Sequence, residues 1–259
     1  METCVSEIRA WMRDNFLKLN DEKTQFMLFG SSSQLAKISV PHITIGDTDV
    51  SVASKARDLG VIFDWTMSLD SHVSSVVCST SFHIHTIGKI RQYLTSKAAE
   101  QIVHSVITSR LDMGNALLFG LPQSQIDRLQ RIQNSAARIV TLSRKACHIT
   151  PVLRELHWLP VKFRIIYKML LFVYKSIHGL APAYIDDLLQ PYNPTRSLRS
   201  SSMNLFREPR SSHSWGDRSF SCAAPRLWNK LPARLQSSPS LPQFKEHLKT
   251  HLFNQAFID

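Results

Sequence analysis

The sequence lacks the features that mark secreted, disulfide-bonded and membrane-spanning proteins. Its four cysteines are spaced too irregularly for a disulfide framework or a CxxC zinc site. No apolar run reaches the roughly 18–20 residues that span a bilayer, because Lys168 and Lys175 interrupt the longest candidate, residues 165–177. The N-terminal residues include acidic side chains and no apolar signal core. We therefore expect an intracellular protein with reduced thiols and no membrane partner.

Common catalytic and cofactor-binding signatures are also missing. The chain contains no GxSxG, Walker A, GxGxxG or HExxH motif, so we expect no small-molecule substrate and no resident cofactor. His247 and His251 lie four residues apart on a predicted helix and could share a metal ion. A pair of surface histidines is the simpler interpretation, because no further ligand lies nearby in the sequence. We therefore predict no metal site.

Acidic residues are scarce in the second half of the chain. Residues 1–120 carry 11 lysines and arginines against 12 aspartates and glutamates, a net charge of −1. Residues 121–259 carry 20 basic against 8 acidic residues, a net charge of +12. Such an asymmetry favours a polyanionic partner, most often nucleic acid, although a basic surface can also serve solubility alone.

What the sequence does contain is enough apolar side chain for a core, since 43% of its residues are hydrophobic. The periodicity predicts an α+β fold that is mostly α, with one helix and three or four strands followed by helices. Predicted helices cover residues 3–19, 73–94, 97–110, 124–141, 161–177, 223–232 and 241–253, and predicted strands cover 23–29, 42–45, 49–52 and 57–63.

Breaks in this pattern suggest five segments. Residues 1–64 form the helix-plus-strand part, 65–143 a helical region, and 144–191 a second helical region. Residues 192–216 are rich in serine, arginine and proline and predict a flexible basic connector, and 217–259 return to helical periodicity.

Residues 124–141 have the clearest helical pattern in the chain. Their apolar side chains fall on one arc at about 100° per residue, whereas Arg128, Arg131 and Arg138 cluster on a different arc. Together with Arg144 and Lys145 they form the candidate phosphate-binding face that we favour, and the alternative is an ordinary solvated helix face.

A second basic cluster lies in the connector, and tryptophans offer possible stacking surfaces. The connector cluster contains Arg196, Arg199, Arg207 and Arg210. Trp158 and Trp228 stand among apolar residues and predict core positions. Trp215, inside the connector, is the best candidate for stacking on a base.

Several strings of residues resemble one family. Residues 10–30 read AWMRDNFLKLNDEKTQFMLFG, and residues 57–73 read RDLGVIFDWTMSLDSHV. The later strings HWLPVKFRIIYKMLLFVYK, HGLAPAYIDDLL, TRSLRSS, GDRSFSCAAPRLWNKLP and FKEHLKTHLF follow in order. Over essentially the whole chain these strings resemble the C-terminal part of LINE-type, jockey-like non-LTR retrotransposon reverse transcriptases.

The resemblance implies roles for some residues. Residues 10–30 match motif D of the polymerase palm, and Lys23 matches the lysine that is thought to protonate the leaving pyrophosphate, a role that an ammonium group can fill. Leu59, Gly60 and Val61 match the primer grip of motif E. By the same resemblance, residues 1–64 would be a partial palm sheet and residues 65–143 a thumb-like bundle.

The catalytic aspartates of that family have no match in this chain. Reverse transcription needs two Mg²⁺ ions held by palm carboxylates, and in the family these carboxylates precede motif D. The string Tyr184-Ile185-Asp186-Asp187 spells YxDD, but it follows Lys23 and has helical spacing. We therefore expect no catalytic residue here and no Mg²⁺, which only the full-length parent enzyme would hold.

The sequence thus predicts the remnant of an RNA-directed DNA polymerase that is not an enzyme as it stands. It would bind RNA or DNA weakly and without sequence preference. The alternative that stays open is a host-recruited or non-functional basic helical protein that acts as an interaction module.

Overall fold

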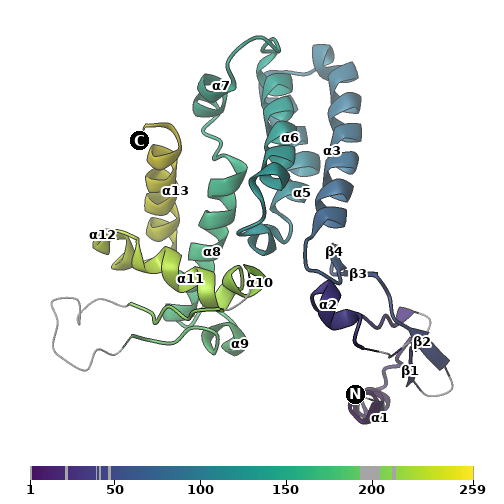
Figure 1. Ribbon diagram of the computed structural model, residues 1–259. Coiled ribbons are helices and arrows are strands. Elements are labelled where there is room, and N and C mark those ends of the chain that lie inside the picture. The colour runs from purple at the N-terminus through teal and green to yellow at the C-terminus, as the bar shows by residue number, and fades with distance from the viewer. Residues whose placement is uncertain are drawn as a thin grey trace. The chain divides into compact units, whose positions relative to one another are not determined.

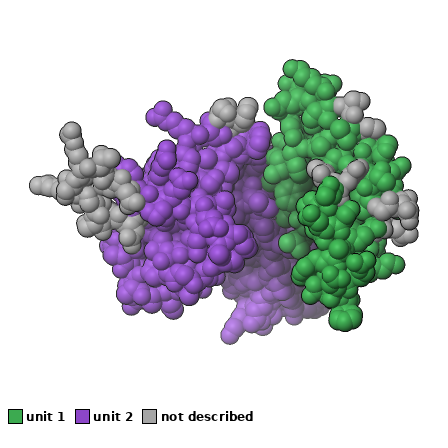
Figure 2. Space-filling view, turned by 90° about the horizontal axis from the view of Figure 1, so that it is seen from below, with its two compact units in different colours: residues 1–74 green, residues 75–259 purple. Residues whose placement is uncertain are grey.

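The structure, a computed structural model, describes residues 2–20, 23–38, 40, 42–45, 48–192, 205–211 and 214–258. Figure 1 shows the elements, and Figure 2 colours two compact units, Met1–Ser74 (unit 1) and Ser75–Asp259 (unit 2). Helices predominate and the strands form only small antiparallel sheets, so the expected mostly helical α+β class is confirmed. The two units are coarser than the five predicted segments, whose boundaries stay predictions.

Unit 1 contains short elements around a small apolar cluster. Ile43 pairs with Val50 in the antiparallel hairpin of β1 (His42–Ile45) and β2 (Thr48–Ser51), where strands were predicted at residues 42–45 and 49–52. Phe26, Ile45 and Val50 form the buried cluster. The elements of this unit are α1 (Glu2–Asp14), α2 (Ser32–Leu35), β1 (His42–Ile45), β2 (Thr48–Ser51), β3 (Lys55–Asp58) and β4 (Val61–Asp64), and α3 (Asp70–Ile90) begins here.

Two strand predictions in unit 1 were wrong. Residues 23–29 form no strand, because only Phe26 bridges to Val52 and a strand needs a partner along its length. Residues 57–63 are not one strand but parts of the β3–β4 hairpin, in which Asp58 pairs with Val61. Leu59 and Gly60, between these paired residues, form a tight turn. The hydrophobic pattern of residues 57–63 does not show this turn.

Asp64 organises the turn that leads from β4 into α3. Its buried carboxylate accepts hydrogen bonds from the hydroxyls of Thr66 and Ser68, and from the backbone N–H groups of Ser68 and Leu69 at 2.9 and 2.7 Å. Burial by itself would raise the pKa of Asp64, but these hydrogen bonds outweigh it and lower the pKa below its ordinary value. Asp64, which belongs to the string of residues 57–73 quoted above, therefore has a clear structural role.

Unit 2 is a helical assembly whose longest helices match the prediction. Thr95 caps α4 by accepting a hydrogen bond from the backbone N–H of Ala98. The elements after α3 are η2 (Arg91–Tyr93), α4 (Ser96–Val103), η3 (His104–Thr108, a π-helical turn), α5 (Ser109–Asp112), η4 (Asn115–Leu118), α6 (Gln123–Thr141), α7 (Ile149–Glu155), α8 (Val161–Ile177), α9 (Ala183–Asp186), α10 (Ser214–Asp217), α11 (Phe220–Asn229), α12 (Ala233–Gln236) and α13 (Leu241–Phe257).

The core of unit 2 lies where α8 packs against α11 and α13. Tyr174 of α8 stacks on Phe244 of α13 at a ring-centroid distance of 4.2 Å, and Trp228 of α11 lies 5.9 Å from the same ring. The Tyr174 hydroxyl donates a hydrogen bond to the Ser238 carbonyl, so the buried phenol keeps a partner. The core positions predicted for Trp158 and Trp228 are confirmed, since both are buried.

Part of the predicted basic connector is docked onto unit 2. Phe206 is buried and forms an isolated bridge with Pro191. The Asn229 side chain of α11 donates to the Phe206 carbonyl at 2.8 Å and accepts from the Phe206 N–H at 3.0 Å. Residues 205–211 are thus extended but held in place, which differs from the flexible segment that we expected.

Candidate nucleic-acid interface

The α6 helix positions the arginines that were predicted to bind phosphate. Its apolar arc is buried as predicted, so its other side faces away from the core. Arg131 is exposed, whereas Arg128 and Arg138 are half-buried. The Arg128 side chain donates to the Gln125 side chain, and the Arg131 Nε donates to the Asp127 carbonyl at 3.2 Å. Both arginines therefore already have partners on their own helix.

The end of α6 turns the chain sharply and directs Arg138 and Lys145 to the same region. Leu142 ends the helix in the left-handed conformation, with φ of 57°, and its N–H bonds to the Arg138 carbonyl. The Arg138 Nη2 donates to the Cys147 carbonyl at 3.3 Å. This contact holds the loop after α6, which carries Lys145, against the helix.

Arg91 fixes the end of α3 to the end of α6. Its buried guanidinium donates to the carbonyls of Ile139 and Val140, both at 2.7 Å. It also donates to the Leu94 carbonyl at 2.7 Å. These carbonyls include the last groups of α6, which lack partners inside the helix, so Arg91 acts as a C-terminal cap supplied from a distant part of the chain.

A groove of about 660 Å³ lies between the C-terminal parts of α3 and α6 and the loop that follows α6. Among the described residues, none that lines this groove is acidic. The groove therefore has a positive potential and suits an anion. Its lining residues are Ile84, Gly88, Arg91, Ser135, Arg138, Ile139, Leu142, Ser143 and Lys145.

Two cationic side chains in the groove keep hydrogen-bonding capacity for a ligand. The Arg138 Nε is buried and has no hydrogen-bond partner among the described residues. Lys145 is exposed. A Cβ added at Gly88 would meet no atom within 4 Å, so the α3 side of the groove is open at this point. The groove therefore offers open space beside Gly88 and two cationic side chains that could take part in binding a phosphate.

The remaining members of the predicted basic sites are scattered. Arg128 and Arg131 lie earlier on α6 and do not line the groove. Arg144 is exposed next to Lys145 but does not line the groove either. Arg196 and Arg199 lie outside the described residues. Of the predicted arginines and lysine that the structure describes, only Arg138 and Lys145 thus line this groove together.

The residues assigned by resemblance lie in unit 1. Lys23 is exposed, and its backbone N–H bonds to Asn20. Leu59 and Gly60 form the turn of the β3–β4 hairpin with φ of 44° and 89°, while Val61 is buried at the start of β4. Leu59 is 93% exposed, so an apolar side chain stands at the tip of a hairpin in a conformation that costs energy for any residue with a Cβ.

The YxDD string and Trp215 lie in surroundings that do not indicate a functional site. Residues 184–186 of the YxDD string lie in the short helix α9, as their spacing predicted, and Tyr184 is exposed. Trp215 lies in α10 and is 51% exposed. Within the described part of the chain, no group of three or more histidine, cysteine, aspartate or glutamate side chains could hold a metal ion.

Sequence reasoning missed the residues that complete the groove. Arg91 was not singled out, because nothing near it in the sequence distinguishes a capping arginine from a surface one. Ser135 and Ser143 are ordinary serines in the sequence, although Ser135 lies one helical turn from Arg138 and could have been included on that basis.

Comparisons with known proteins add no relative. No protein-family model matches the chain, and no curated protein or solved structure resembles it significantly. Among the described residues, no helix is both long and apolar enough to cross a bilayer.

Proposed function

We propose that this chain binds RNA or DNA through the groove between α3 and α6, by contacts to phosphates and without reading sequence. The observation that carries the proposal is that Arg138 and Lys145, chosen from the sequence as phosphate-binding residues, line one groove whose described lining residues include no carboxylate. We further propose, from the resemblance of its motifs, that the chain is a remnant of a non-LTR retrotransposon reverse transcriptase with a partial palm and a thumb-like bundle.

The physical support for phosphate binding comes from charge and from available donors. Residues 121–259 carry the whole positive excess of the chain, and Arg138 and Lys145 belong to that half. A buried Nε without a partner is costly unless a ligand or water completes it. A phosphate oxygen would accept from this group and from the Lys145 ammonium, giving charge-assisted hydrogen bonds.

The proposed remnant is not an enzyme as these residues stand. Lys23 and the turn at Leu59 are parts that would hold or assist a primer in the parent, but two-metal transfer also needs carboxylates that this sequence does not offer in the family's order. A primer-extension assay with Mg²⁺ should therefore yield no product. Incorporation of nucleotides by this chain alone would contradict the proposal.

Nucleic-acid binding is tested by fluorescence anisotropy with a labelled single strand and a labelled duplex. Affinity should fall steeply between about 50 and 200 mM salt. The double variant Arg138→Ala with Lys145→Ala should flatten the dependence of log K on log salt by up to about 1.8 on duplex, because each lost phosphate contact removes about 0.9.

A matched control separates the groove from general charge. The double variant Arg154→Ala with Lys162→Ala removes the same two charges from exposed sites on α7 and α8 that do not line the groove. It should change the slope far less than the groove variant. Equal slopes for the two double variants, or no binding at about 50 mM salt, would refute the groove as the site.

The exposed apolar residues of unit 1 favour a second candidate function. Ile8, Trp11 and Phe16 are largely exposed on or just after α1, which is unusual for side chains of that size. A host-recruited interaction module would use such a surface to contact a protein. Substitution of Trp11 by serine should then leave nucleic-acid binding unchanged and abolish association with that protein.

A further inference from the structure

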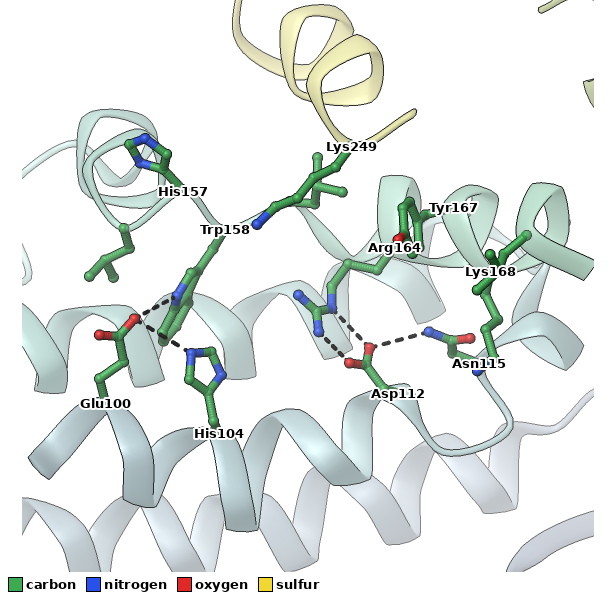
Figure 3. A pocket seen from close by; sticks show the side chains of 13 residues that line it. Glu100, His104, Asp112, Asn115, His157, Trp158, Arg164, Tyr167, Lys168 and Lys249 are labelled. Carbon is green, nitrogen blue, oxygen red and sulfur yellow. Dashed lines mark hydrogen bonds and ion pairs between the residues drawn. The ribbon is translucent and has the colours of Figure 1, made fainter. Parts of the chain in front are cut away.

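A second cavity, separate from the groove, lies in unit 2. Its volume is about 440 Å³, within the range of pockets that hold small molecules. Figure 3 shows the side chains that line it, which come from α4, η3, α5 and η4, from the segment between α7 and α8, and from α8 and α13. None of its lining residues belongs to the groove at the end of α6.

The two carboxylates of this cavity already have internal partners. Asp112 forms a two-pronged ion pair with Arg164, whose Nε donates to it at 2.9 Å. Glu100 lies 3.5 Å from the His104 ring nitrogen and accepts a hydrogen bond from the Trp158 indole at 3.4 Å. Figure 3 shows both pairings as dashed lines. The acidic groups are thus held by their neighbours and are poor anchors for a cationic ligand.

Two lysines in the same cavity have no such partner. Within the described residues, neither Lys168 nor Lys249 forms a hydrogen bond or an ion pair, and Lys168 lies 5.4 Å from the centre of the Phe172 ring. The two ammonium groups come from different helices, α8 and α13. Among the lining residues the lysines and Arg164 outnumber the two carboxylates by three to two, so the cavity retains a net positive charge.

A buried acceptor adds a second requirement on the ligand. Asn115 is 4% exposed, and its amide nitrogen donates to Asp112 at 3.2 Å. Its Oδ1 is buried and has no partner among the described residues. A buried carbonyl oxygen without a hydrogen bond costs free energy. A ligand that donates a hydrogen bond from a hydroxyl or amino group would therefore gain affinity here.

Apolar side chains supply the remaining wall. Leu159, Leu171 and the Trp158 ring line the cavity, and all three are otherwise packed into unit 2. Tyr167 also lines it, and burial raises the pKa of this phenol, which keeps it neutral and able to donate a hydrogen bond at physiological pH. A flat or partly apolar group could therefore rest between the charged positions.

From this arrangement we infer that the cavity binds a small phosphorylated molecule that also carries a hydroxyl or amino donor, as nucleotides do. The ammonium groups of Lys168 and Lys249, which both line the cavity, supply the positive charge that attracts the phosphate. The hydroxyl or amine donates to the Asn115 Oδ1. The sequence alone led us to expect no small-molecule substrate, and the ligand inferred here departs from that expectation.

The test uses the full chain and isothermal titration with adenosine monophosphate, adenosine and inorganic phosphate as probes. Adenosine monophosphate should bind saturably, at least about ten-fold more tightly than adenosine or phosphate, since only it meets both requirements. Lys249→Ala and Lys168→Met should each weaken this binding about ten-fold. The methionine keeps the apolar stem that packs along α8.

Matched controls are Lys245→Ala on α13 and Lys175→Met on α8, which remove equal charge outside the cavity and should leave binding unchanged. Absence of saturable binding at 10 mM nucleotide, or equal affinity for adenosine, would overturn the inference. So would unchanged affinity in both lysine variants.

The inference stands apart from the proposed nucleic-acid binding. Lys249→Ala should leave oligonucleotide affinity unchanged, whereas loss of Arg138 and Lys145 should leave nucleotide binding unchanged. If Lys249→Ala weakens oligonucleotide binding and the oligonucleotide displaces the nucleotide, the cavity is part of a nucleic-acid surface and the inference fails.

Discussion

The two units differ in how well they cover their own apolar side chains. In unit 2, large residues such as Trp228, Tyr174 and Phe244 are almost fully buried and stack on one another. In unit 1, Trp11 is 60% exposed and Phe16 is 100% exposed, although both are as apolar as the residues buried in unit 2. Apolar content therefore does not by itself predict a core, because helices must also supply surfaces that face each other.

The strands of unit 1 sharpen this difference. They form two separate two-stranded sheets, and an isolated two-stranded sheet is only marginally stable in water. The packing of α8 with α11 and α13 does not depend on a partner strand, since each helix forms its backbone hydrogen bonds within itself. We therefore expect unit 1 to open more readily than unit 2.

The largest expected effect contrasts one phenylalanine from each core. Phe244→Ala should lower the free energy of unfolding of unit 2 by about 3–5 kcal/mol, because Phe244 is fully buried between Tyr174 and Trp228. Phe26→Ala should cost unit 1 only about 1–3 kcal/mol, since few neighbours surround it and the site can collapse.

Native-state hydrogen exchange, read separately on peptides of α8 and of β1, measures both free energies. Leu188→Ala, at an exposed position after α9, serves as the control for a lost apolar group. An equal loss of unfolding free energy for Phe244→Ala and Phe26→Ala would contradict the difference between the units.

A smaller effect is expected at Asp64. Asp64→Asn should cost unit 1 about 0.5–2 kcal/mol at pH 7, because the substitution weakens the contacts to Ser68 and Leu69 that start α3. The pKa of Asp64 is lowered in the folded chain, so its stabilising effect is complete above the unfolded pKa and is lost as the pH falls through the folded one.

The difference between wild type and Asp64→Asn should therefore shrink below about pH 4. Chemical denaturation from pH 3 to 7 gives this curve. Asp58→Asn, an exposed carboxylate in the same hairpin, should show no comparable change. A difference that stays constant with pH would contradict a charged Asp64 in the folded state.

The smallest effect is a gain at the hairpin tip. Leu59→Asn should stabilise unit 1 by about 0.5–1 kcal/mol, because asparagine followed by glycine suits a turn with two positive φ angles and the exposed leucine loses no packing. Thermal melting and hydrogen exchange at β3 and β4 report the gain. A loss of stability would mean that the Leu59 side chain has a contact that the structure does not record.

Much of the helical architecture could be predicted, because long amphipathic segments carry their own signal. The predicted segment 161–177 coincides with α8, and the arc of Leu129 and Val140 in α6 is buried as expected. The strand predicted at residues 23–29 does not form, since a strand depends on a partner that the local pattern does not contain. The apolar residues of 57–63 predicted one continuous strand, so the turn at Leu59 and Gly60 was not predicted either.

The candidate sites were less accessible from sequence. Arg138 and Lys145, two of the residues predicted to bind phosphate, line one groove, whereas Arg128 and Arg131 lie on the same helix as Arg138 but do not line it. The separate cavity was missed, because Lys168 and Lys249 are distant in the chain and line one cavity only after α8 packs against α13. Such a set of residues leaves no local pattern to detect.

The C-terminal cap that Arg91 supplies to α6 changes the electrostatics of the groove. The C-terminal end of a helix carries roughly half a negative charge from its free carbonyls, and that charge would repel an approaching phosphate. Because the Arg91 guanidinium bonds to the carbonyls of Ile139 and Val140, the end of α6 is neutralised before any anion arrives. The chain can thus place an anion-attracting surface at the helix end that ordinarily disfavours one.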